Sequence, residues 1–253
     1  MPMKPKALVL LSYGTNRDRD VAEALALAGA EPEIVPLNEL RSGERRWTDF
    51  QMLVLPGGFS YADALGAGKL VAIDLQAYFA EEIHRFVEAW KPVIGICNGF
   101  QALVKSGILG NGREGEATLT FNAEGHFECR WVTLKPVSEK CVWTKGLEAL
   151  IECPIAHGEG NFQTVDRSLP ADLIALAYVR ADGSAASDSY PANPNGSILD
   201  IAGITNPAGN VLGLMPHPEN HIHPWQHPQW TRGVERGSGL VLFMNGVKYA
   251  EEL

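Results

Sequence analysis

A cysteine between two glycines is the first feature of the sequence that could do chemistry. The segment Gly95-Ile96-Cys97-Asn98-Gly99 lies where an apolar run gives way to a helical pattern. A nucleophile at such a turn sits on a sharp elbow, and glycine two residues to either side removes side chains that would clash. The N-terminus of the following helix favours the thiolate and leaves the Asn98 amide free to bind an oxyanion. A buried structural cysteine is the alternative, and the flanking glycines favour the nucleophile.

A pair of glycines indicates a second part of the same site. Pro56-Gly57-Gly58 directly follows the apolar run Met52–Leu55. Paired glycines allow the backbone to approach a ligand closely and present an N–H group. Loops at the carboxyl ends of adjacent parallel strands share one crevice, so Gly58 is expected to face Cys97. A plain tight turn is the alternative interpretation.

A histidine and a glutamate two residues apart indicate the third part. In Met215-Pro216-His217-Pro218-Glu219, Pro218 biases His217 toward an extended conformation. Residues two apart in an extended segment project to the same side, so Glu219 can orient His217 as a general base. A histidine suits this role because its pKa lies near neutrality. A solvated loop that happens to contain both residues is the alternative.

The elements that must position these residues alternate in the first 110 residues. Apolar runs predict strands, and apolar residues at helical spacing predict helices between them. Continuous apolar strands separated by amphipathic helices indicate a parallel sheet covered on both faces. The expected strands are Ala7–Leu11, Glu33–Leu37, Met52–Leu55 and Pro92–Ile96, and the expected helices cover Val21–Ala28, Phe79–Trp90 and Phe100–Leu109.

The second half of the chain reads mainly as strands with short polar connections. These are Phe127–Val137, Pro154–His157, Leu173–Val179, Ile198–Thr205 and Val211–Met215, with a hairpin turn at Asn206–Asn210 and a closing helix within Gly237–Tyr249. No long linker separates the halves. The sequence therefore predicts a single α/β domain over residues 1–253, with a mostly parallel central sheet, helices on both faces, and antiparallel strands that extend the sheet.

Composition and charge restrict the classes of function. A net charge of -9 and a pI near 5.3 argue against broad nucleic-acid or anionic-membrane binding. No apolar run approaches the ~18 residues of a membrane helix, and Met1–Lys6 shows no signal-peptide pattern. The four cysteines have no CxxC spacing, which indicates neither a disulfide framework nor a zinc knuckle and fits a reducing cytoplasm. Without a GxxxxGK[ST] loop, we expect no ATP site and no cofactor in this chain.

Several other histidines could be site residues. A zinc site could be formed by His217, His221, His223 and His227. However, no cysteine joins them and prolines interrupt their spacing, so we expect no metal. A solvated or partner-facing loop is the default there. His157-Gly158-Glu159-Gly160 is either part of the site or a glycine-rich loop that supports its wall.

Together these segments resemble the class I (triad) glutamine amidotransferases, and among them the glutaminase subunits of phosphoribosylformylglycinamidine synthases. The resemblance extends over nearly the whole chain. Its marks are Gly14-Thr15-Asn16 with Asp18-Arg19-Asp20, Pro56–Tyr61, Gly95–Gln101, Phe127–Trp131, Ile155–Gly160, Asn193–Ser197 and Met215–Glu219.

The resemblance implies a flavodoxin-like fold and a role for each site residue. Cys97 would be the nucleophile, His217 the general base and acid, and Glu219 the carboxylate that orients His217. The oxyanion amides would come from Gly58 and Asn98, and Gln101 would help to bind glutamine.

It also implies partners. Ammonia released from glutamine through a cysteine thioester would pass to a large synthase that uses ATP and Mg, accompanied by a small accessory subunit. That synthase would convert formylglycinamide ribonucleotide to the amidine in purine synthesis. Neither nucleic acid nor a membrane is an expected partner.

Two positions depart from the family pattern, and two other functions stay open. Ala62 stands where glycine is usual, and Asn220 stands where arginine is common. A cysteine hydrolase of the same fold family acting on another amide, or a stress-type peptidase-like protein, is one alternative, although the HGEG segment and Pro218-Glu219 fit it poorly. A binding module without turnover is the other, and the intact set of Cys97, His217 and Glu219 argues against it.

Overall fold

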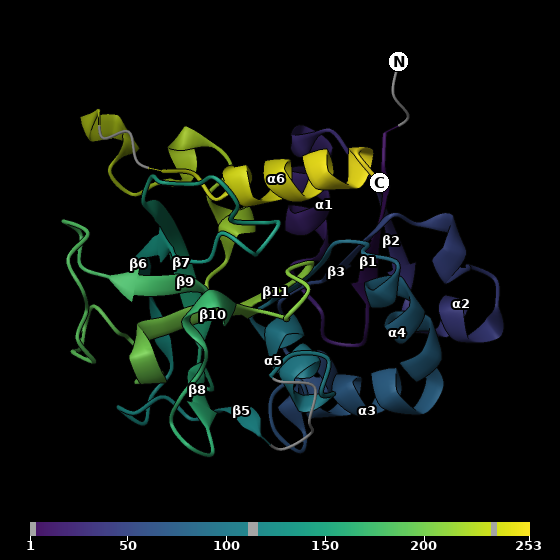
Figure 1. Cartoon of the computed structure of the whole chain (residues 1–253), viewed down its shortest axis with the longest axis horizontal. Coiled ribbons are helices and arrows are strands. Elements are labelled where there is room, and N and C mark those ends of the chain that lie inside the picture. The colour runs from purple at the N-terminus through teal and green to yellow at the C-terminus, as the bar shows by residue number, and fades with distance from the viewer. Residues whose placement is uncertain (1–3, 111–115, 234–236) are drawn as a thin grey trace.

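A nine-stranded sheet runs through the molecule with helices on both faces (Figure 1). The computed structural model describes residues 4–110, 116–233 and 237–253. The first three residues, on which the expectation of no signal peptide partly depends, lie outside this range. The strands of the main sheet are β1 (Lys6–Leu11), β2 (Glu31–Pro36), β3 (Met52–Leu55), β4 (Val93–Ile96), β6 (Glu128–Pro136), β7 (Ile151–His157), β9 (Ile174–Val179), β10 (Ile201–Thr205) and β11 (Val211–Leu214).

Five strands form the parallel half of the sheet. The strand order is β2-β1-β3-β4-β11-β10-β9-β6-β7, and the first five strands pair in parallel. All residues of β3, β4 and β11 are buried, as expected for strands covered on both faces. The predicted α/β class is confirmed.

The antiparallel half begins at β10, which is joined to β11 by the expected turn at Asn206–Asn210. From β10 onward each neighbouring pair is antiparallel. A small second sheet, β5 (Ala117–Thr120) with β8 (Asn161–Thr164), was not predicted from the sequence. It attaches to the main core through Phe162 of β8, which stacks on Phe100 with ring centroids 6.2 Å apart.

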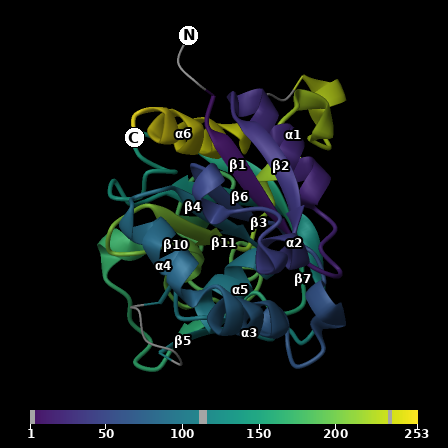
Figure 2. The ribbon, with the colours of Figure 1, turned by 90° about the vertical axis from the view of Figure 1, so that its right-hand side faces the viewer.

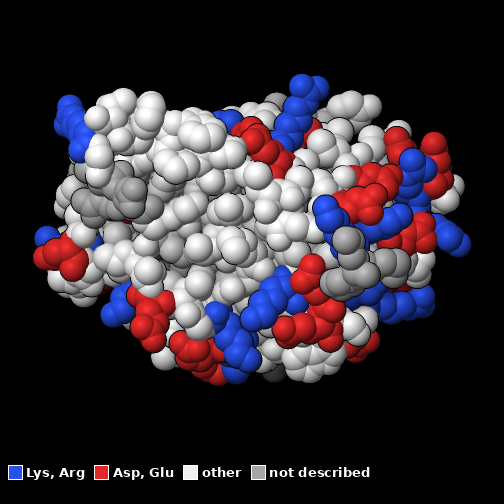
Figure 3. Space-filling model, turned by 90° about the horizontal axis from the view of Figure 1, so that it is seen from above, with Lys and Arg blue, Asp and Glu red and all other residues white. Residues whose placement is uncertain are grey.

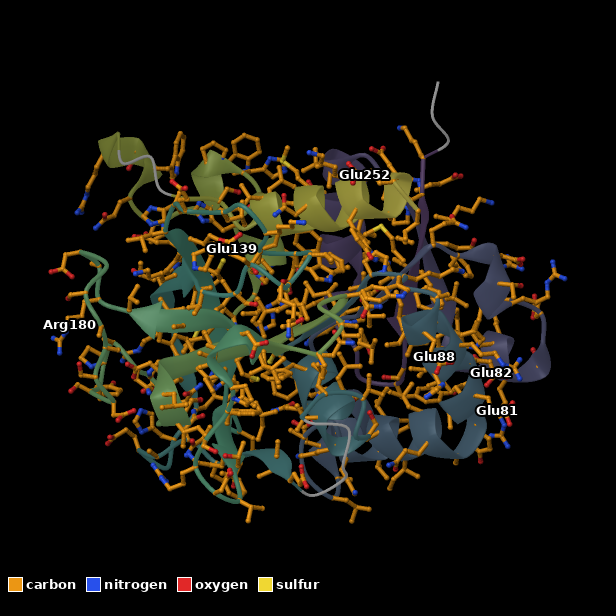
Figure 4. The ribbon with its side chains drawn as sticks, viewed as in Figure 1. Glu81, Glu82, Glu88, Glu139, Arg180 and Glu252 are labelled. Atoms are coloured by element: carbon orange, nitrogen blue, oxygen red, sulfur yellow. The ribbon has the colours of Figure 1, made fainter. Side chains whose placement is uncertain are left out.

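The helices lie in two layers around the sheet. In Figures 1 and 2, α1 and α6 lie side by side on one face, and α3, α4 and α5 lie on the other. Glu81 and Glu82 of α4, labelled in Figure 4, point away from the sheet. The bounds are α1 (Asp18–Ala28), α2 (Leu37–Ser42), α3 (Lys69–Tyr78), α4 (Ala80–Glu88), α5 (Asn98–Lys105) and α6 (Leu240–Glu251).

Several helix bounds differ from the sequence prediction, and α2 was not foreseen. The helix expected over Phe79–Trp90 ends at Glu88, and α3 before it was not foreseen. Phe79 separates these two helices with a φ of -135°, which breaks a helical path that its apolar periodicity would continue. The helix after Cys97 stops at Lys105 and not at Leu109, because the chain turns at Gly107 with a φ of 79°.

Candidate active site

The elbow at Cys97 is as sharp as its flanking glycines suggest. Cys97 has a φ of 50° and a ψ of -105° between β4 and α5. A Cβ on Gly99 would lie 1.9 Å from the backbone oxygen of Leu55, and one on Gly95 would lie 2.8 Å from the backbone of Gly99. Only glycine at these two places lets α5 lie so close to the ends of β3 and β4. The thiol is nearly buried, with Sγ 3.9 Å from Ala156 O.

A loop after β1 holds the glycine pair after β3. Asn16 N–H and Arg17 N–H both donate to Gly57 O, and Phe59 N–H donates to Gly14 O. A Cβ on Gly58 would lie 2.6 Å from Gly14 O, so the close approach requires glycine. Within the described residues, neither Gly58 N–H nor Asn98 N–H donates to a protein acceptor. Both amides are therefore available to a ligand.

His217 and Glu219 form the expected pair, although the backbone between them is not extended. His217 Nδ1 lies 2.7 Å from Glu219 Oε1. Pro218–Asn220 is a 3₁₀ turn, which corrects the extended geometry expected from the sequence. Pro218 still fixes the turn because its ring sets φ and cannot continue a strand ladder. The turn brings the two side chains together within two residues.

The charges around His217 favour its protonated form. Burial alone lowers the pKa of His217, but the charges of Glu219 and Cys97 outweigh burial and raise this pKa well above its ordinary value. Glu219 is fully buried, so its charge acts on His217 with little screening by water. His217 also packs against the glycine pair, since a Cβ on Gly57 would lie 2.7 Å from His217 Cε1.

Side-chain hydrogen bonds connect the elbow to the loop after β3. The Asn98 side chain accepts a hydrogen bond from the Ser60 hydroxyl and donates to Asp63 Oδ1 at 3.3 Å and Gln101 Oε1 at 3.1 Å. Gln101 Nε2 in turn donates to Glu159 O at 2.6 Å. The predicted glutamine-binding residue thus bonds to the HGEG loop. The sequence reasoning did not single out Ser60 as a partner of Asn98.

These residues surround a pocket of about 150 Å³. Gly58, Cys97 and Gln101 line it together with His157, Gly158 and Glu159 of the HGEG loop. Three phenylalanines also line the pocket and remain largely exposed: Phe59, Phe121 and Phe127. The structure therefore brings Gly58, Cys97 and Gln101 to one pocket, with His217 beside them.

His157 belongs to the wall as a neutral imidazole. Burial, and next the charge of His217, lower the pKa of His157 to about 3. Its Nδ1 lies 3.2 Å from Asn122 Oδ1, and the same oxygen accepts from Gly160 N–H. Asn122 was not found from the sequence, because nothing near it in the chain marks it as a residue of the wall. A permanently neutral His157 cannot exchange protons near neutral pH.

The remaining histidines of the C-terminal segment bond to glutamates and stack on aromatic rings. His221 Nδ1 lies 2.5 Å from Glu152 O, and His227 Nε2 lies 2.9 Å from Glu152 Oε2. Both rings pack edge-on against Trp131. Among residues 4–110, 116–233 and 237–253, no group of three or more His, Cys, Asp or Glu side chains is arranged to hold a metal ion.

The two departures from the family pattern each have a structural counterpart. Ala62 has a φ of 54°, a left-handed conformation that glycine adopts at a lower steric cost because it has no Cβ. Asn220 donates to Asp20 Oδ2 at 3.1 Å and so ties the turn after His217 to α1.

Comparison with known proteins identifies the family. The model of the CobB/CobQ-like glutamine amidotransferase domain matches residues 4–250. The phosphoribosylformylglycinamidine synthase subunit PurQ of Treponema denticola is 57% identical over 241 residues, which are 87% of this chain and 89% of the relative. The same subunit from Dehalococcoides mccartyi is 44% identical over 256 residues, which are 99% of each chain.

The solved structures agree with the sequence relatives. A chain in the structure of PurLQS from Thermotoga maritima superposes with a TM-score of 0.76 and 34% identity, covering 98% of this chain and 99% of that one. No helix among the described residues is long and apolar enough to cross a membrane. The protein therefore belongs to the CobB/CobQ-like glutamine amidotransferase family, among the PurQ-type subunits of phosphoribosylformylglycinamidine synthase.

Proposed function

We propose that this chain hydrolyses glutamine to glutamate and ammonia with Cys97 as nucleophile, His217 as general base and acid, and Glu219 as the carboxylate that orients His217. The observation that carries the proposal is that the elbow cysteine and Gly58, whose amide is free, line one pocket, with the charge-paired His217 and the free amide of Asn98 next to Cys97. The whole chain, residues 1–253, acts as one domain.

The reaction follows from this geometry. His217 takes the proton of the Cys97 thiol, Sγ attacks the amide carbon of glutamine, and the negative charge on oxygen is stabilised by Gly58 N–H and Asn98 N–H. Protonated His217 gives its proton to the leaving nitrogen, the C–N bond breaks, and ammonia departs. His217 then takes a proton from water, which attacks the thioester, and the C–S bond breaks to release glutamate and restore the thiol. Gln101 holds one wall of the substrate pocket through Asn98 and Glu159.

The ammonia is delivered to a partner synthase. The named relatives are subunits of phosphoribosylformylglycinamidine synthase, and the superposed chain comes from a PurLQS complex. By this relationship the partner is a large synthase that uses ATP and Mg to convert formylglycinamide ribonucleotide to the amidine, with a small accessory subunit beside it. We place the reaction in the cytoplasm, where the Cys97 thiol stays reduced.

The exposed phenylalanines around the pocket are the surface that we assign to this partner. Phe59 and Phe127 stack with ring centroids 6.4 Å apart, and Phe121 is 72% exposed. Exposed aromatic rings next to an active site are a frequent feature of interface cores. The segment 188–197, a candidate contact on sequence grounds, contributes less, since Asn193, Asn195 and Ser197 are buried and bond inward.

The experiment that tests the assignment is replacement of the nucleophile. Cys97→Ser should lower glutamine-dependent activity by several orders of magnitude and leave the ammonia-dependent activity of the synthase complex intact. Cys153→Ser is the matched control, because Cys153 is a buried free thiol on β7. Glutamine turnover by Cys97→Ser above about a tenth of the wild-type rate would contradict the assignment.

A further inference from the structure

A second cavity opens where the strand order of the parallel sheet reverses. In the order β2-β1-β3-β4, β2 lies on one side of β1 and β3 on the other. Open α/β sheets bind ligands outside the carboxyl ends of their strands at this reversal, and flavodoxin-like sheets do so between β1 and β3. The catalytic cysteine of this chain follows β4 instead. The crevice at the reversal has no part in the proposed reaction.

This cavity is large enough for a small organic ligand. Its volume is about 510 Å³, against about 150 Å³ for the glutamine pocket. Ligand sites commonly have volumes of ~300–1,000 Å³. The segments after β1, β2 and β3 all contribute to its wall, through residues that include Tyr13, Asn38 and Tyr61.

Two tyrosines give one side of the cavity an aromatic character. The rings of Tyr13 and Tyr61 have centroids 6.3 Å apart and are tilted by 59°. Tyr61 O–H donates to Asp74 Oδ2 at 2.7 Å, which fixes its ring and leaves the other carboxylate oxygen to accept from a ligand. Tyr13 is 83% exposed, so its ring face is open to stacking by a planar group.

A cation without an anionic partner among the described residues also lines the cavity. Arg41 at the end of α2 lies over the ring of Tyr78, 3.8 Å from its centroid. Among the described residues the Arg41 side chain makes no ion pair or hydrogen bond, whereas the neighbouring Arg45 and Arg46 each pair with a carboxylate. Its planar guanidinium is suited to bind a phosphate or a carboxylate.

We propose that this cavity binds a planar aromatic anion of the nucleoside monophosphate class and that the bound ligand raises the glutaminase rate. The aromatic part would stack on Tyr13, the anionic group would pair with Arg41, and Asp74 would accept from an amino or hydroxyl group.

The cavity wall is connected to the glycine pair of the active site. Tyr61 N–H donates to Tyr13 O at 2.7 Å, and Phe59 N–H donates to Gly14 O at 2.9 Å. Thr15 and Gly58 form an isolated β-bridge next to the second of these bonds, and Asn16 N–H donates to Gly57 O on its other side. A ligand that orders Tyr13 and Tyr61 therefore also orders Gly58. This coupling rests on the proposed role of Gly58 as an oxyanion donor, whereas binding to the cavity does not.

Calorimetric titration of the whole chain tests binding, with AMP as the probe and adenosine and inorganic phosphate as separate arms. Wild type should bind AMP more tightly than either fragment. Arg41→Ala should weaken AMP binding about tenfold, and Tyr13→Ala should weaken it by a similar factor. Arg46→Ala is the matched control, because Arg46 is exposed and lies outside the cavity. The Cys97→Ala variant should bind AMP like wild type, which separates this result from the fate of the proposed function.

Glutamine hydrolysis by the isolated chain tests the coupling, and AMP should raise its kcat/KM about fivefold. No AMP binding at millimolar concentration, or equal binding by Arg41→Ala and Arg46→Ala, would overturn the proposal. Equal binding of inorganic phosphate and AMP would show that the aromatic group adds nothing to binding, and would overturn the proposed stacking on Tyr13. If AMP fails to bind and Tyr13→Ala instead weakens association with the synthase, the cavity is part of the protein interface and the small-ligand proposal is wrong.

Discussion

At the scale of single residues, the charge of Glu219 decides the behaviour of His217. Burial lowers the pKa of His217, while Glu219 and Cys97 raise it, and the net pKa is raised. Because Glu219 bonds to Nδ1, Nε2 is the ring nitrogen left to act on the substrate. In the proposed reaction, this arrangement keeps a proton on the imidazole next to Cys97, and that proton goes to the leaving nitrogen.

Removing the charge of Glu219 should therefore change the pH profile. In Glu219→Gln the pKa of His217 falls, because the negative charge that raised it is lost. His217 then loses its proton at lower pH. The alkaline limb of kcat/KM should move to lower pH, with a fall in rate of about 10²-fold, whereas His217→Ala should cost about 10⁴-fold. A pH series of glutamine hydrolysis measures both effects. An alkaline limb that stays in place in Glu219→Gln, or a mild loss in His217→Ala, would contradict these roles.

Ala62 provides a residue-scale test of backbone strain next to the active site. Tyr61, Ala62 and Asp63 have φ values of 53°, 54° and 52°, three successive left-handed residues in the loop after Gly58. Ala62→Gly should stabilise the protein by about 1 kcal/mol, because glycine adopts this conformation without its Cβ clashing. Urea denaturation measures the change. Ala64, with a φ of -58°, is the control, and Ala64→Gly should destabilise the protein by about 0.5–1 kcal/mol.

If Ala62→Gly and Ala64→Gly shift stability in the same direction, the conformation of residue 62 is not the source of strain. A stabilised Ala62→Gly with altered activity would show that the stiffness of this loop matters for the oxyanion site.

At the scale of elements, the nucleophile depends on how closely α5 packs against β3. A Cβ on Gly99 would lie 1.9 Å from Leu55 O, and neither backbone can yield without moving the elbow. Gly99→Ala should cost about 3 kcal/mol of stability. Gly158→Ala is the control, since its Cβ would meet only Phe127 at an ordinary 3.8 Å. Thermal unfolding of both variants measures the difference, and equal stability would show that α5 can move away from β3 at little cost.

At the scale of the whole molecule, charge and apolar surface are distributed unevenly. Seen from the side of α6, charged residues gather toward the edges of the face and leave its middle largely uncharged (Figure 3). The exposed phenylalanines lie at the pocket, at the carboxyl ends of the parallel strands. Under the proposed function, the partner that receives ammonia must reach that pocket.

We therefore expect the isolated chain to hydrolyse glutamine slowly and the synthase to accelerate it. Docking would order the loop around Gly58 and exclude water from the pocket. The measurement compares glutamine hydrolysis by the purified chain with and without the synthase, its nucleotide ligands and its substrate. A rise of at least about tenfold is expected. Equal rates would exclude gating by the partner and leave the amidohydrolase assignment intact.

Much of the candidate site could be predicted from the sequence alone. Cys97, Gly58 and His217 were predicted because each lies in a short segment with a local signal: glycines at fixed offsets around an elbow, paired glycines after a strand, and a histidine two residues before a glutamate. The order of strands and helices in the first half followed from apolar periodicity, which local sequence carries directly.

The tertiary structure decided what depends on distant contacts. Asn98 bonds to Ser60 and Asp63, and His157 bonds to Asn122. Each of these contacts joins residues that are about 35 positions apart in the chain. The 3₁₀ turn at Pro218 and the break at Phe79 also differ from what local patterns predicted. Local sequence reports propensity, but burial, strand order and the electric field around a side chain are set only when the chain is packed, and these quantities fix the pKa of His217 and the shape of both cavities.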